Sequence, residues 1–442
     1  MALLLRHANC IDPAVGFNQA QLKDILIRDG IIASINDSAT TTDQAHPDSD
    51  FDGIEVYDLA GRLVVPGLMD MHVHLRDPGQ EYKEDILSGA RAAARGGFTA
   101  VLAMPNTIPT VDSGAEVGYV LKKASENTLT RIYQAGALTV GLKGQALSEM
   151  ADMAEAGALA FSDDGQGLQD SGMMRLAMEY AATLDKPVLS HCQVNSLTAS
   201  GQVNEGLVST RLGLAGWPAA GEQIMVARDI ALAELTGARL HIQHVSTAAT
   251  VELVRAAKKR GVAVTAEVTP HHLFLSEQAL DERYDTNLKM NPPLRTPADT
   301  EALQIALIEG VIDCVASDHA PHARHEKALE FELAPFGVIG LETALGLVLS
   351  ELVTKGRMSL TQLVERMAHA PRRILGLPAV NLAVGSQADL TVIEPDYKWQ
   401  VNADDFVSRS QNSAFIGRQL IGRASDVFVA GEKSLERGVV KC

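Results

Sequence analysis

His72, His74 and Arg76 lie two positions apart in the segment 68–79, which reads LMDMHVHLRDPG. Successive side chains of a strand point to opposite faces, so Asp70, His72 and His74 share one side, and methionine and valine side chains occupy the other. Polar groups that gather at the end of a strand with one apolar face indicate a site. On this segment alone, a pair of ordinary polar histidines near a strand end is an equally open interpretation, because His-x-His occurs by chance.

Similar polar residues follow most of the apolar, β-rich segments in the middle of the chain. We expect eight strands, at 68–74, 99–104, 131–137, 158–162, 188–191, 240–245, 262–268 and 312–317. Six of them end at or just before His, Asp or Asn, namely His72 and His74, Asn106, Asp163-Asp164, His191, His244, and Asp318-His319. Random placement of 13 histidines would not favour these positions.

Helical segments separate most of these strands, at 85–95, 172–184, 223–235, 250–259 and 299–308. Eight strand–helix units in about 250 residues predict an α/β fold with a (β/α)8 TIM-type barrel, whose catalytic groups gather at the carboxyl ends of the strands. A doubly wound open sheet is the competing topology. The lack of Gly-x-Gly-x-x-Gly after the first strand weakens that alternative.

Both ends of the chain predict short strands, at 2–6, 24–28, 31–35 and 54–58 and again at 388–393, from 399 onward and at 424–429. We therefore expect a small β-rich domain built from both chain ends, with residues 1–64 and 377–442 flanking a barrel of residues 65–376. The polar stretch 36–52 predicts a loop.

The composition is that of a globular protein with a large core, since 46% of the 442 residues are hydrophobic and 21% are charged. A formal net charge of -17 argues against binding to nucleic-acid phosphates. Four scattered cysteines without a Cys-x-x-Cys pair are typical of a reducing compartment. No segment approaches the roughly 18 apolar residues of a membrane span, and the apolar start is too short for a signal segment. We expect a cytoplasmic protein with no membrane partner.

Four imidazoles with one or two carboxylates and no thiolate are a ligand set for zinc or a similar divalent ion. Any one of these histidines, taken alone, would be read as a hydrogen-bonded core residue. Their common placement at strand ends favours the metal site. One carboxylate can give an oxygen to each of two ions, which together activate water and polarise a carbonyl.

At these residues the sequence resembles the dihydroorotases of the amidohydrolase superfamily, specifically their long-chain bacterial class. The matching segments run in order through the central region: DMHVHLRDPG (70–79), MPNT (104–107), FSDDG (161–165), SHC (190–192), QHVS (243–246), TPHH (269–272), KMNPPLR (289–295), SDHAPH (317–322), APFG (334–337) and GLET (340–343). No single segment is decisive, but the ordered set is specific.

The resemblance implies the reversible closure of N-carbamoyl-L-aspartate to L-dihydroorotate, a step of pyrimidine synthesis, with one or two zinc ions per subunit. It assigns metal binding to His72, His74, Asp164, His191, His244 and Asp318. Asp318 is implied to be the catalytic proton shuttle. Substrate binding is assigned to His74, Arg76, Asn106, Asn291, His322, Phe336 and Gly337.

One position separates this family from its neighbours. Hydantoinases and allantoinases carry a carbamylated lysine on the fourth strand, whereas no lysine lies between Lys143 and Lys186 here. Asp164 is the expected bridging carboxylate, and Asp163 is its competitor. Two other functions stay open: a hydantoinase-like cyclic amidase, and an inactive structural partner of aspartate transcarbamoylase. For the active enzyme we expect a small-molecule substrate, a homodimer and a possible association with aspartate transcarbamoylase.

Overall fold

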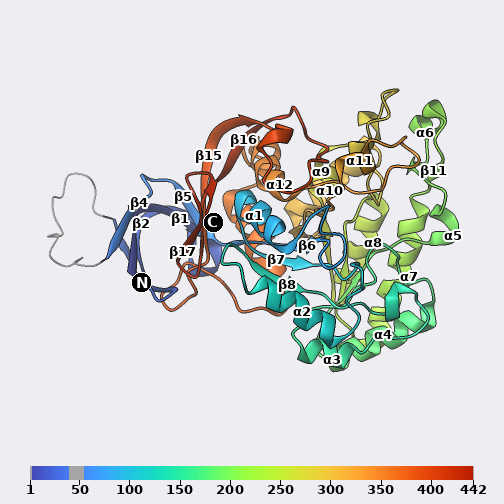
Figure 1. The fold of residues 1–442 in the computed structure, drawn as a ribbon, viewed down its shortest axis with the longest axis horizontal. Helices are drawn as coiled ribbons and strands as arrows, with labels where there is room; N and C mark the ends of the chain where they lie inside the picture. Colours follow the sequence, from blue (N-terminus) through green and yellow to red (C-terminus); the bar gives the residue numbers. More distant parts are fainter. Residues whose placement is uncertain (1, 39–53, 442) are drawn as a thin grey trace.

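A nine-stranded sheet brings the two ends of the chain together (Figure 1). The computed structural model describes residues 2–38 and 54–441. The strands follow the order β18-β17-β16-β15-β5-β1-β2-β3, with β4 paired to β1. Their bounds are β1 (Ala2–Asp12), β2 (Phe17–Arg28), β3 (Ile31–Asp37), β4 (Glu55–Asp58), β5 (Leu63–Pro66), β15 (Leu390–Gln400), β16 (Gln419–Val429), β17 (Glu432–Glu436) and β18 (Val439–Val440).

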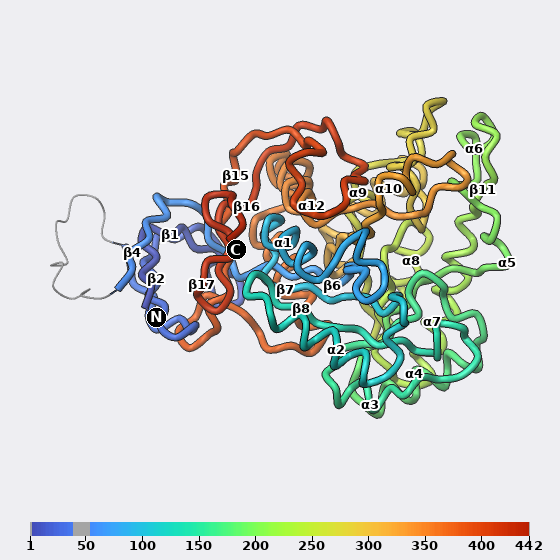
Figure 2. Tube along the Cα trace, viewed as in Figure 1, coloured from blue at the N-terminus to red at the C-terminus, as the bar shows by residue number. Residues whose placement is uncertain are grey.

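Strand β5 is the junction of this sheet. It pairs in parallel with β1 through Leu63 and Val64, and antiparallel with β15 through Val64 and Val65, among others. Inward-facing apolar side chains from both chain ends form one cluster beside it, including Leu5, Ile25 and Val392. The small β-rich domain is therefore a single packed unit, and it lies at one end of the molecule (Figure 2).

The middle of the chain forms a closed ring of parallel strands. These are β6 (Leu68–Val73), β7 (Phe98–Ala103), β8 (Arg131–Gln134), β9 (Val188–Ser190), β12 (Leu240–Ile242), β13 (Val264–Val268) and β14 (Cys314–Val315). Phe161 fills the fourth place, with parallel bridges to Gly136 and Val188, and a bridge between Val73 and His319 closes the ring. The predicted (β/α)8 barrel is confirmed.

Helices cover the ring (Figure 1). They are α1 (Ile86–Gly96), α2 (Gly114–Ala124), α3 (Met150–Glu155), α4 (Ser171–Thr183), α5 (Asn195–Thr198), α6 (Leu207–Leu212), α7 (Ala220–Thr236), α8 (Ala248–Lys259), α9 (Pro270–Phe274), α10 (Pro297–Glu309), α11 (Arg324–Lys327), α12 (Leu341–Val348), α13 (Leu360–Val364) and α14 (Ala370–Ile374). Within the excursion 195–219, β10 (Val203–Asn204) pairs with β11 (Gly216–Trp217). None of the helices in the described ranges is long and apolar enough to cross a bilayer.

Several local expectations differ from the structure. The fourth strand, expected at 158–162, is reduced to the bridging residue Phe161, although backbone hydrogen bonds still join Leu159, Ala160 and Ser162 to Gln134 and Gly136. The two strands expected at 388–393 and from 399 onward form one continuous strand, β15. Of the predicted loop 36–52, residues 39–52 lie outside the described residues. The domain boundaries after residues 64 and 376 stay a prediction.

Glu342 connects the barrel, through hydrogen bonds, to the segment between β15 and β16. It lies at the start of α12, which packs on α1 and β16. Its carboxylate accepts hydrogen bonds from the backbone amides of Val407 at 3.1 Å and Ser408 at 3.0 Å. Burial raises the pKa of Glu342 to about 7.

The raised pKa of Glu342 makes a testable contribution to stability. The folded protein binds the Glu342 proton more tightly than the unfolded chain does. The stability that this proton contributes is therefore lost as the pH rises from about 4.5 to about 7. We expect the free energy of unfolding of Glu342→Gln, relative to that of the unsubstituted chain, to increase by about 2–3 kcal/mol when the pH is raised from 5 to 8. Denaturant unfolding at both pH values measures this difference. An equal stability difference between the two proteins at both pH values would contradict this assignment.

Candidate metal centre and active site

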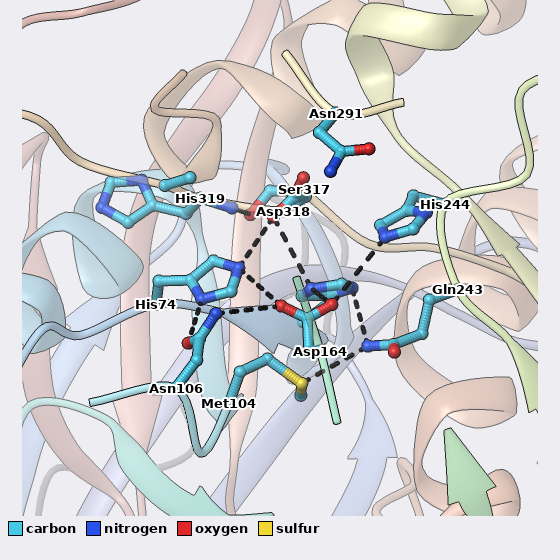
Figure 3. A network of polar contacts seen from close by, with 12 residues as sticks. His74, Met104, Asn106, Asp164, Gln243, His244, Asn291, Ser317, Asp318 and His319 are labelled. Carbon is cyan, nitrogen blue, oxygen red and sulfur yellow. Dashed lines mark hydrogen bonds and ion pairs between the residues drawn. The ribbon is translucent and has the colours of Figure 1, made fainter. Parts of the chain in front are cut away.

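Six polar residues from five barrel positions meet at the carboxyl ends of the strands. His72 and His74 come from β6 and the residue after it, Asp164 follows Phe161, and His191, His244 and Asp318 follow β9, β12 and β14. All six are buried. Figure 3 shows Asp164 in the middle of this group, with His74, His244 and Asp318 around it.

The Asp164 carboxylate is shared among the histidines. Its Oδ1 lies 3.4 Å from His72 Nε2, 3.4 Å from His191 Nδ1 and 3.8 Å from His244 Nε2. Its Oδ2 lies 3.5 Å from His74 Nε2. The carboxylate therefore faces histidines with both oxygens, as a ligand shared by two ions would.

Asp318 lies opposite, with its Oδ1 3.0 Å from His74 Nε2 and 3.6 Å from His72 Nε2. Potential ligand atoms fall into two overlapping groups, each within 4.8 Å: one holds His72, Asp164 and His244, and the other holds His72, His74 and Asp318. Their residue types and burial suit a zinc-like cation.

Two buried atoms in this group lack hydrogen-bond partners: His72 Nε2 and Asp164 Oδ1. Buried polar atoms are normally satisfied, so orphaned lone pairs that face one another need an explanation. A divalent cation between them would supply it. The donors of this chain thus fit one or two metal ions.

The Asp163 carboxylate is bound to the loop after β8 and not to the histidines. Its Oδ1 accepts hydrogen bonds from the backbone amides of Leu138 at 2.9 Å and Thr139 at 3.0 Å, and its Oδ2 accepts one from the Thr139 hydroxyl. Through these hydrogen bonds the Asp163 carboxylate holds the loop after β8 in place. Between the two competing carboxylates, the geometry favours Asp164 as the bridging ligand.

The charges of the cluster are mutually dependent. Burial alone would raise the pKa of Asp164 and of Asp318, but the charge on His72, together with hydrogen bonds from neighbouring imidazoles, lowers both pKa values below the usual range. Against the same desolvation, the charges of nearby carboxylates raise the pKa of His72. Both carboxylates are therefore ionised at neutral pH and available as anionic ligands.

A cavity of about 240 Å³ opens over these residues. All seven predicted substrate-binding residues line it: His74, Arg76, Asn106, Asn291, His322, Phe336 and Gly337. Arg76 Nε donates to the Pro321 carbonyl at 3.1 Å, and no carboxylate of the described ranges pairs with its guanidinium. Arg76 thus has charge available for an anionic ligand.

Asn106 joins the two halves of the site. Its Oδ1 lies 2.8 Å from His74 Nδ1, and its Nδ2 donates to Asp164 Oδ2 at 3.2 Å. Asn291 donates to Gln193 Oε1 at 2.9 Å, while its own Oδ1 is buried without a partner. Both amides are therefore positioned at the cavity, and Asn291 keeps a free acceptor.

Two buried lysines hold the loop that carries Phe336 and Gly337. Lys289 Nζ donates to the Phe331 carbonyl at 2.7 Å, and Lys327 Nζ donates to the Gly337 carbonyl at 3.0 Å. Gly337 has a φ of +124°, and a Cβ there would lie 2.8 Å from Ala320 Cβ, so only glycine fits. Its amide donates to the Lys289 carbonyl, so this wall of the cavity is fixed before any ligand arrives.

Three other polar residues near the site are engaged elsewhere. His272 is held between the Thr269 hydroxyl and the Pro292 carbonyl. The ring of His319 points away from Asp164 in Figure 3, and its Nε2 lies 3.3 Å from Glu84. Cys192 contacts Ser190 and Asp229 behind the rim.

Sequence reasoning missed Glu267, which lies inside the barrel on β13. Its Oε1 lies 2.5 Å from His72 Nδ1. Burial opposes ionisation, but His72 and His241 outweigh it and lower the pKa of Glu267 to about 2. The available signal was a single acidic residue within the apolar, buried strand VTAEV.

Solved structures share this fold. L-hydantoinase (dihydropyrimidinase) from Arthrobacter aurescens aligns with a TM-score of 0.87 and 27% identity, over 100% of this chain and 97% of that chain. D-hydantoinase (dihydropyrimidinase) from Thermus sp. aligns with a TM-score of 0.83 and 25% identity, over 99% and 96%. The barrel, its His–Asp rim and the β-rich domain therefore define the class: a cyclic-amide hydrolase of the amidohydrolase type.

Comparison with sequence relatives identifies the family within this class of hydrolases. Residues 61–250 match the family described as Dihydro-orotase-like. The dihydroorotase of Pelotomaculum thermopropionicum is 48% identical over 100% of both chains, and that of Geobacter sp. (strain M21) is 46% identical over 99% of this chain and 100% of its own. The chain belongs to the dihydroorotase family.

The neighbouring carboxylates Asp163 and Asp164 provide a matched test of the metal centre. We expect Asp164→Asn to weaken divalent-ion binding by about 100-fold or more, since an anionic shared ligand is lost. Asp163→Ala should leave metal content unchanged but destabilise the fold by about 1–3 kcal/mol, because two buried amides lose their acceptor. Elemental analysis and thermal unfolding of both proteins measure these effects. Metal loss in the Asp163 variant alone would reverse the assignment.

Proposed function

We propose that this chain is an active, metal-dependent dihydroorotase that interconverts L-dihydroorotate and N-carbamoyl-L-aspartate in pyrimidine synthesis. The observation that carries the proposal is the whole-chain identity of 44–48% to relatives named dihydroorotase, together with a rim that retains every implied ligand type. The proposed ligands are His72, His74, Asp164, His191, His244 and Asp318.

Zinc is the proposed metal, because imidazole nitrogens and carboxylate oxygens without thiolates suit it. When bound, one or two such ions would polarise the ring carbonyl and acidify a water molecule. Asp164 presents Oδ1 to His72, His191 and His244 and Oδ2 to His74, so its carboxylate could serve two neighbouring ions.

Asp318 is the proposed proton shuttle. Its carboxylate lies at the floor of the cavity and is ionised, so in the hydrolytic direction it can take the proton of the attacking water. It then delivers this proton to the ring nitrogen that departs. Ring closure is the reverse and requires Asp318 to be protonated first, which favours closure at lower pH.

Arg76 is the proposed partner of the carboxylate beside the substrate ring. A guanidinium presents a planar fork of donors that matches a carboxylate, and this one has no competing anion within ion-pair distance in the described part of the chain. Asn106, Asn291 and His322 line the same cavity and can complete the polar contacts. Among cyclic amides, a ring that carries a carboxylate therefore fits best.

The two rival functions are less well supported. A hydantoinase-like amidase shares the fold, but its rings need no carboxylate partner, and the fourth-strand segment carries Asp164 in place of a lysine. An inactive partner of aspartate transcarbamoylase would be expected to have lost ligand residues, and this chain keeps all six. Cytoplasmic location, a homodimer and association with aspartate transcarbamoylase stay predictions.

The proposed activity is tested by assaying the purified chain with dihydroorotate, carbamoyl aspartate and hydantoin. We expect turnover of the first two and little of the third. Asp318→Asn should reduce kcat by about 1,000-fold or more while the fold is retained, because proton transfer loses its carrier. Substantial turnover by this variant, with wild-type metal content, would reject the shuttle role.

The anion-binding role of Arg76 is tested with Arg76→Met and the matched variant Arg76→Lys. Loss of a charged, bidentate contact is worth about 1.5–3 kcal/mol, so we expect Arg76→Met to raise KM for dihydroorotate by about 10–100-fold. Arg76→Lys keeps the charge without the fork and should give an intermediate KM. Steady-state kinetics at saturating metal measure both, and an unchanged KM in Arg76→Met would refute the contact.

A further inference from the structure

A chain of four polar side chains runs beneath the metal centre, inside the barrel. The Thr265 hydroxyl lies 2.8 Å from His241 Nδ1, His241 Nε2 lies 3.1 Å from Glu267 Oε2, and Glu267 Oε1 lies 2.5 Å from His72 Nδ1. Of these, Glu267, His241 and His72 are fully buried. This series of contacts therefore links a proposed metal ligand to three residues that do not line the cavity.

We propose that Glu267 is a positioning residue for the metal centre, which fixes the tautomer and orientation of His72 and anchors the backbone of His244. This inference rests on the proposed metal-dependent function. Glu267 does not line the cavity, so its proposed role is additional to those of the rim residues.

The contacts of His72 define which of its ring nitrogens can bind a cation. An imidazole that binds a cation is neutral and keeps one proton. The Glu267 carboxylate, 2.5 Å from His72 Nδ1, accepts that proton there, and this charged acceptor outweighs the neutral Gln243 amide nitrogen 3.2 Å from the same atom. In that form His72 Nε2 carries the lone pair for the cation, and it is the atom that faces Asp164 and Asp318 without a hydrogen-bond partner. Glu267 thereby selects the form of His72 that can bind a cation.

Glu267 also acts on a second proposed ligand through its backbone. The amide of His244 donates to Glu267 Oε1 at 3.2 Å. His244 has a φ of +34°, a conformation that L residues rarely adopt and that needs support from its surroundings. One carboxylate thus holds the side chain of one proposed ligand and the main chain of another.

His241 stabilises the buried carboxylate of Glu267 in the core. A buried anion needs partners that satisfy its oxygens, and His241 occupies Oε2 while His72 and the His244 amide occupy Oε1. The Thr265 hydroxyl holds the other nitrogen of His241 in turn. The second oxygen of Glu267 is therefore bound, and the carboxylate cannot rotate away from His72 without losing that bond.

A second cation among His241, Glu267 and Cys314 is the competing interpretation, since potential ligand atoms of these three lie within 4.8 Å. Both nitrogens of His241 already have partners. Burial raises the pKa of the Cys314 thiol well above its usual range, so it is neutral and a poor ligand. The contacts favour the positioning role.

The test is zinc binding by the metal-free full-length chain, measured by competition with a chromophoric chelator. We expect Glu267→Gln to weaken the affinity for Zn²⁺ by about 10–100-fold, the usual effect of losing a residue that orients a ligand. Asp426→Asn is the matched control, because Asp426 is a fully buried carboxylate of the β-rich domain that contacts Tyr57 and Arg62. It should lower the thermal midpoint of the metal-free chain without changing zinc affinity.

Wild-type zinc affinity in Glu267→Gln, or an equal loss in Asp426→Asn, would overturn the proposal. If Glu267→Gln does not fold, Glu267→Asp replaces it, because it keeps the charge but withdraws the carboxylate from His72 by one methylene. Unchanged affinity in that variant would also overturn the proposal. Since zinc binding is measured without turnover, a wild-type chain that binds zinc but converts no dihydroorotate would reject the proposed function alone.

Discussion

The site depends on the electrostatic cost of burying a carboxylate among histidines. Asp164 has almost no contact with water, and four imidazoles from three strands surround it. A buried anion is costly unless charge or hydrogen bonds compensate for it, so this arrangement requires either protonated histidines or a cation. The unsatisfied atoms at the centre of the group are the physical reason to infer a metal.

The barrel is what makes this compensation possible. The pair His72 and His74, His191, His244 and Asp318 are far apart along the chain, and the closing bridge between Val73 and His319 completes the ring that brings Asp318 beside His74. The loop walls are fixed separately: Asp163 fastens the loop after β8, and Lys327 fastens the loop at Gly337. The ligands and the cavity walls are thus held by different interactions.

Much of this arrangement could be predicted from the sequence because the signals are local. His72, His191 and His244 stand at the ends of apolar segments, and the parallel barrel turns this linear pattern into a shared rim. Glu267 could not be assigned in the same way, since its role depends on His241 and His72, which come from two other strands. Strand lengths also escaped prediction, as the reduction of the fourth strand to Phe161 shows.

The placement of β5 between β1 and β15 has a consequence for how the protein is made. During synthesis the barrel emerges from the ribosome before β15 and β16, so one edge of the β1–β5 sheet has no neighbour until residues 390–400 have been translated. An unpaired edge of this kind is a template for pairing with other chains. Nascent chains that stop short of residue 390 would therefore be prone to association, and completion of the sheet serves as a late step in maturation.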